Sequence, residues 1–125
     1  MTLLPLLLAG ALAADPAAFL RSGRQAARAG QWSKAESQLL RAEEGARQTD
    51  DASLELAARL ARVDLRLAAD EHDSAASLLP ALPLRAVATA DSAVWHLARA
   101  RVALARGERG EAMTESDIAL RLADR

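Results

Sequence analysis

Residues 28–35 read RAGQWSKA, and two later passages repeat their pattern, AADEHDSA at 68–75 and ARGERGEA at 105–112. Each passage has one residue suited to a turn, followed five positions later by an alanine; the turn residues are Gly30, Asp70 and Gly107. Glycine ends a helix in the left-handed conformation without a Cβ penalty, and aspartate is a poorer substitute. Each passage therefore predicts a helix, a tight turn and a returning helix.

The composition agrees with a helical chain. Of the 125 residues, 51% are hydrophobic but only 2% are aromatic, and alanine and leucine supply most of the apolar fraction. Such residues favour helix over strand. The alanines at Ala35, Ala75 and Ala112 allow close helix crossing. Repeated units of this kind bury their apolar faces only by stacking. We expect an all-α fold, a stack of about three antiparallel helical hairpins.

The pattern resembles the tetratricopeptide repeat over nearly all of residues 16–125. The small residues at the eighth position of each repeat are Gly23, Val63 and Ala100, and Trp32 matches the usual aromatic after the turn. His72 and Arg109 replace that aromatic in the later repeats, and the turn residues lie 40 and 37 positions apart rather than roughly 34. The resemblance places Arg59, Arg62 and Arg66 at positions that the family buries, which charged side chains do not suit.

The sequence predicts six helices, over residues 16–29, 33–48, 51–69, 73–82, 91–106 and 109–123. Pro16 suits the first position of a helix. Ser33 with Glu36 has the spacing of a capping box, and Asp50 or Asp51 and Asp91 are further candidate caps. Pro80 and Pro83 shorten or kink the fourth helix, and residues 83–90 stay ambiguous.

Residues 1–13 are predicted to be a signal peptide. The run MTLLPLLLAGALAA at 1–14 carries no charge and places small residues at Ala11 and Ala13, which suits cleavage between Ala13 and Ala14. A helix over this run would be about 20 Å long, too short for the ~30 Å hydrocarbon core, so no stable membrane span is expected. Residues 14–125 would then form the repeat domain. Alternatively, the apolar run packs on the first hairpin of a cytoplasmic protein.

Composition and motifs argue against enzymatic catalysis, metal binding and nucleic-acid binding. The 16 basic and 17 acidic residues nearly cancel, which gives no general attraction for phosphates. The chain has no cysteine, and its two histidines, His72 and His96, lack metal-ligand spacing. No nucleotide-binding motif occurs. We therefore expect no enzyme activity, no catalytic residue, no metal and no cofactor.

Leucines at helical spacing form the candidate binding site. Leu60, Leu67, Leu97 and Leu104 recur at equivalent positions, which in the resembled family face a concave groove. Arg24, Asp64 and Arg101 would lie on its rim. The favoured interpretation makes the leucines core, because helical apolar stripes usually are; the alternative makes them the groove floor for a peptide. Arg59, Arg62 and Arg66 would be a solvated row paired with nearby glutamate and aspartate side chains. Trp32 and Trp95 would be packing anchors.

The helix expected at 109–123 carries apolar residues around much of its surface, namely Met113, Ile118, Leu120 and Leu122. Open ends of helical stacks usually need a polar cover, so we expect self-association or a partner here. The leading function is a protein–protein interaction scaffold exported to the bacterial cell envelope. The alternatives are a cytoplasmic interaction subunit and a regulatory module that binds a peptide or small apolar ligand in the groove.

Overall fold

The structure, a computed structural model, describes residues 15–79 and 89–124. Within these ranges it contains helices and no strand, which confirms the all-α prediction. The helices are α2 (Pro16–Arg28), α3 (Trp32–Gln48), α4 (Ala52–Ala68), α5 (His72–Ser77), α6 (Thr89–Ala105) and α7 (Arg109–Ala123). The predicted signal peptide at 1–13, with its cleavage point between Ala13 and Ala14, lies outside the described residues.

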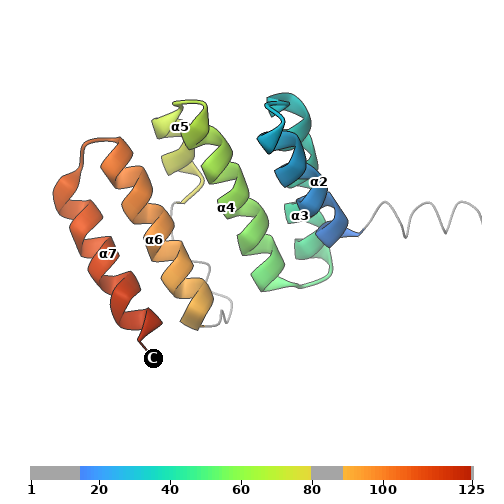
Figure 1. Ribbon diagram of the computed structural model, residues 1–125. Helices are drawn as coiled ribbons and strands as arrows, with labels where there is room; N and C mark the ends of the chain where they lie inside the picture. The colour runs from blue at the N-terminus through green and yellow to red at the C-terminus, as the bar shows by residue number, and fades with distance from the viewer. Residues whose placement is uncertain (1–14, 80–88, 125) are drawn as a thin grey trace, which may run out of the picture.

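The helices form three hairpins that lie side by side (Figure 1). Helix α4 occupies the middle: it packs against α3 and also contacts α2 on one side and α6 on the other. Helix α7 lies at the outer edge, and among the described helices it contacts α6 alone. The stack of antiparallel hairpins expected from the repeats is therefore present.

The three turns have the geometry that the sequence predicts. Gly30, Asp70 and Gly107 have positive φ angles of 74°, 63° and 79°. In each turn the next residue's N–H donates to a carbonyl five positions back, as Gln31 does to Ala26 at 2.9 Å. Asp50 joins the first two hairpins with the same left-handed conformation, at φ 57°. The next residue, Asp51, caps α4 by accepting from the Leu54 N–H at 3.1 Å.

Two predicted caps are wrong. The N-cap of α3 is Gln31, with Ser33 inside the helix, and the Glu36 side chain pairs with arginines of α4 instead of closing a capping box. Asp91 lies in the first turn of α6, which begins at Thr89, and its carboxylate accepts a 2.6 Å hydrogen bond from the Ser53 hydroxyl. Glu36 and Asp91 therefore connect neighbouring helices instead of capping the helices to which they belong.

Helix α5 is shorter than the predicted 73–82. It ends at Ser77, and Leu78 and Leu79 form a turn before residue 80. Pro80, Pro83 and residues up to 88 lie outside the described residues. The second hairpin therefore pairs a helix of 17 residues with one of only six.

Two apolar clusters make up the core. The first joins α2, α3 and α4 around Leu39, and the second joins α4, α5 and α6 around Trp95. Trp95 is 0% exposed and is a packing anchor, as predicted. Trp32 is 46% exposed, so the same prediction is wrong for Trp32. Gly23 of α2 lies so close to α3 that a Cβ there would stand 2.6 Å from Leu39 Cδ2.

Candidate interaction surfaces

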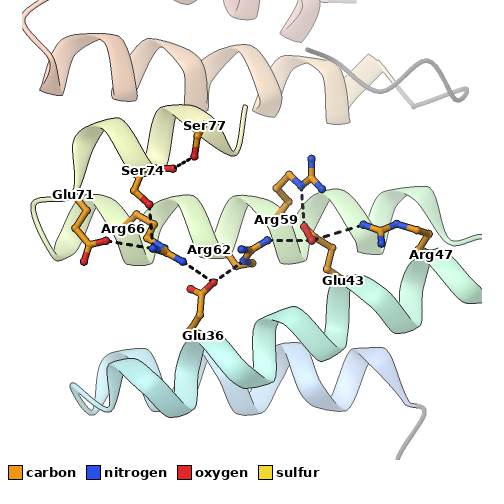
Figure 2. A network of polar contacts seen from close by, with 9 residues as sticks. All are labelled: Glu36, Glu43, Arg47, Arg59, Arg62, Arg66, Glu71, Ser74 and Ser77. Carbon is orange, nitrogen blue, oxygen red and sulfur yellow. Dashed lines mark hydrogen bonds and ion pairs between the residues drawn. The ribbon is translucent and has the colours of Figure 1, made fainter. Parts of the chain in front are cut away.

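Helices α3 and α4 are joined by a network of charged side chains (Figure 2). Glu43 accepts from Arg59 Nε at 2.8 Å and from Arg62 Nη1 at 3.1 Å. Glu36 accepts from Arg62 Nε and from Arg66 Nη2, both at 2.9 Å. Each glutamate thus binds two arginines of the facing helix.

This network corrects the prediction that the three arginines form a solvated row. The side chains of Arg62 and Glu43 are only 11% and 5% exposed. Arg59, Arg62 and Arg66 of α4 each contact a glutamate of α3 (Figure 2). The resemblance had placed them at buried positions, and α3 supplies the carboxylates that make such burial tolerable.

The surroundings of Arg66 favour its charged form. The hydrogen bond that Arg66 donates to Glu36 raises the pKa of Arg66, burial lowers it, and the contact with Glu71 raises it further. Arg66 Nη1 also donates to the Ser74 hydroxyl at 3.0 Å, which ties α4 to α5. Because arginine does not titrate in the working range of proteins, the network links helices and is not suited to proton transfer.

The four leucines of the candidate groove do not share one environment. Leu60 and Leu67 of α4 are partly buried against the second apolar cluster. Leu97 and Leu104 of α6, which stand at the same distances before their turn residue, are 50% and 62% exposed. The core interpretation thus fits α4, and a surface interpretation fits α6. The difference arises because the third hairpin packs on α4, whereas no hairpin after α6 and α7 occurs among the described residues to cover Leu97 and Leu104.

The three charged rim residues follow one another across adjacent helices. Arg24 and Asp64 line a hollow of about 360 Å³ between α2 and α4, and the exposed Trp32 borders it. Asp64 also forms an ion pair with Arg101 of α6, with 2.8 Å between Oδ1 and Nη1. The structure therefore brings the predicted rim residues onto one continuous face, and the Asp64–Arg101 pair bridges the second and third hairpins.

A second hollow, of about 440 Å³, lies between α6 and α7. Leu97, Leu104 and Met113 line it. Leu120 lies about two helical turns beyond Met113 on α7. Met113 and Leu120 are 70% and 65% exposed. We call the four side chains Leu97, Leu104, Met113 and Leu120 the terminal face.

The terminal face uses positions that contact the next hairpin elsewhere in the stack. Counted from their turn residues, Met113 and Leu120 correspond to Glu36 and Glu43 of α3, which bind α4. Leu97 and Leu104 correspond in the same way to Leu60 and Leu67. The terminal face therefore has apolar side chains at the two positions where the first hairpin has carboxylates.

Both histidines have carboxylate partners: His72 Nε2 lies 2.8 Å from Asp70, and His96 pairs with Glu115. No group of three His, Asp or Glu side chains suited to a metal occurs among the described residues. None of the described helices has the length and apolarity needed to cross a membrane.

The sequence indicated the apolar surface of α7, which includes Met113 and Leu120, but not the register of the arginine–glutamate network. The arginine–glutamate network needs the register of α3 against α4, which the sequence did not fix. The terminal face had a usable signal, because aligning the hairpins on Gly30 and Gly107 places Met113 and Leu120 over Glu36 and Glu43.

Comparison of the chain with protein-family models, curated proteins and solved structures gave no match.

Proposed function

We propose that this chain is a non-enzymatic protein–protein interaction scaffold made of degenerate tetratricopeptide-like repeats, and that it binds through the terminal face. The observation that carries the proposal is the exposure of Leu97, Leu104, Met113 and Leu120 at positions where earlier hairpins contact a following helix. Contiguous exposed apolar side chains of this kind mark interaction sites. An amphipathic helix is the partner shape that such a hollow fits.

The absence of cysteine allows a site-specific test. Met113→Cys places a single thiol on the terminal face, and a thiol-reactive photo-crosslinker attached there reports what contacts it in extracts of the source cells. Leu40→Cys on α3, at another exposed leucine, is the matched control. We expect a discrete cross-linked product from Met113→Cys and none from Leu40→Cys. Equal labelling from both positions, or none from either, would refute the proposed function.

A second candidate surface is the hollow bordered by Arg24, Asp64 and Trp32. An exposed tryptophan beside charges of both signs suits a short peptide, as in the expected regulatory alternative. Trp32→Ala would abolish a peptide-binding function here and leave the contacts of Met113 unchanged. The two surfaces are therefore separable by one substitution on each.

We further propose export, with cleavage between Ala13 and Ala14, on the basis of the uncharged apolar run at 1–14. Amino-terminal sequencing of the protein isolated from its natural source tests this. A start at Ala14 is expected for an exported scaffold in the cell envelope, and a start at Met1 or Thr2 for the cytoplasmic alternative.

A further inference from the structure

We propose that the partner of the terminal face is a second copy of this chain, bound by antiparallel pairing of the two α7 helices. This inference rests on the proposed function, because it names the occupant of the same surface. The residues that decide it form one exposed stripe along α7, which consists of Arg109, Met113, Asp117, Leu120 and Asp124. Steps of three and four residues keep all five on one side of a helix.

The stripe is self-complementary about a point between Ser116 and Asp117. Met113 and Leu120 are equidistant from that point, and so are Arg109 and Asp124. In an antiparallel pair with a two-fold axis there, Met113 meets Leu120 of the second copy, and Arg109 meets Asp124 of the second copy. A two-fold axis makes each contact between different residues occur twice, so the pair has two apolar contacts and two ion pairs, besides the approach of the two Asp117 side chains at the axis.

Charge selects the antiparallel arrangement. A parallel pair in register would put Arg109 against Arg109 and Asp124 against Asp124, and such like-charge contacts are unfavourable. Neither Arg109 nor Asp124 makes an ion pair with another residue of the described ranges. Both side chains are exposed, so pairing with a second copy breaks none of the ion pairs that hold the hairpins together.

The hollow beside the stripe accommodates the partner helix. Met113 lines it together with Leu97 and Leu104 of α6, so Leu120 of the second copy, opposite Met113, would lie at its border. Near the axis the Asp117 carboxylates of the two copies lie close together, and this like-charge contact would also be present in a parallel pair in register, so it does not favour one direction over the other. The pairing thus covers apolar side chains that an isolated chain leaves in water.

Charge exchange tests the register. Sedimentation equilibrium of the full chain should show a dimer at micromolar concentration. Arg109→Asp alone and Asp124→Arg alone should each weaken it by about tenfold or more, because two attractive pairs become repulsive. The double variant Arg109→Asp with Asp124→Arg should restore the dimer, and Leu40→Glu, on α3, should leave it unchanged. A monomeric wild-type chain, or single reversals without effect, would overturn the proposal.

Cysteine pairing gives an independent readout of direction. Met113→Cys mixed with Leu120→Cys should form a mixed disulfide on mild oxidation, faster than either variant alone, because a disulfide needs Cα atoms within about 7 Å. Faster homodimeric bonding of Met113→Cys would indicate parallel pairing and refute the arrangement. A monomeric chain that still cross-links another protein from Met113 would overturn self-pairing and leave the proposed function standing; no product of either kind would overturn both.

Discussion

Glu43 of α3 accepts a 3.1 Å hydrogen bond from Arg62 of α4, and both side chains are almost removed from solvent. Glu43 also holds Arg59 at 2.8 Å. A carboxylate and two guanidinium groups thus lie at a helix interface that apolar side chains would ordinarily fill. The pairing is tolerable because the remaining charges are themselves bonded, as Arg62 is to Glu36.

Removing the charge of Glu43 should therefore destabilise the fold. Glu43→Gln leaves Arg59 without its carboxylate partner and leaves Arg62 with Glu36 as its one carboxylate partner. We expect the free energy of unfolding to fall by about 2 kcal/mol. Glu44→Gln, at the exposed neighbouring position, should change it by less than about 0.5 kcal/mol. Urea denaturation followed by circular dichroism measures both; equal effects would mean that the network does not stabilise the protein.

Two glycines in helices should respond to alanine in opposite directions. At Gly23 a Cβ would stand 2.6 Å and 2.7 Å from the Leu39 side chain, so Gly23→Ala should cost about 1–2 kcal/mol despite alanine's better helix propensity. At Gly110 a Cβ meets nothing within 4 Å, and Gly110→Ala should gain about 0.5 kcal/mol. Thermal melts of the two variants give the comparison, and a gain from both would show that α2 and α3 can separate at no cost.

The turn residues should tolerate change according to their φ angles. Gly30→Ala, at φ 74°, should destabilise by about 1 kcal/mol, since a Cβ is unfavourable in the left-handed region. Asp70 already bears that penalty at φ 63°, so Asp70→Gly should be neutral or stabilising by a few tenths of a kcal/mol. Chemical denaturation at one pH checks the pair. A large loss from Asp70→Gly would show instead that its contact with His72 Nε2 matters more than the backbone.

The two tryptophans should be distinguishable by fluorescence. Trp32→Phe leaves only Trp95, which is fully buried, so its emission should be blue-shifted and weakly quenched by acrylamide. Trp95→Phe leaves the half-exposed Trp32, with red-shifted and readily quenched emission. Easy quenching of Trp95 would mean that the second apolar cluster opens in solution.

The sequence predicted the hairpins well and the surfaces poorly, for physical reasons that particular residues illustrate. Gly30 and Gly107 are local signals, since a positive φ requires no distant partner. Ser33 and Glu36 have the spacing of a capping box, which is also a local signal. In the structure the Glu36 carboxylate instead binds two arginines of α4 across the interface. That competition depends on the register of α3 against α4, which no short window of sequence contains.

The candidate groove shows the same limit at the scale of hairpins. Leu60 and Leu97 occupy equivalent positions, yet one is partly buried and the other half exposed. Their difference is decided by whether another hairpin among the described residues packs over them. Periodicity reports that a helix has an apolar side and does not report what covers that side.

Helix α4 contributes Ala58 and Leu65 to one apolar cluster and Leu56 and Val63 to the other. Melting this helix would therefore expose both clusters at once, so the two ends of the stack should lose structure in a single cooperative transition. Amide hydrogens in the middle of α4 should accordingly exchange only by global opening, whereas those of α7, which belongs to neither cluster, should exchange through local fraying.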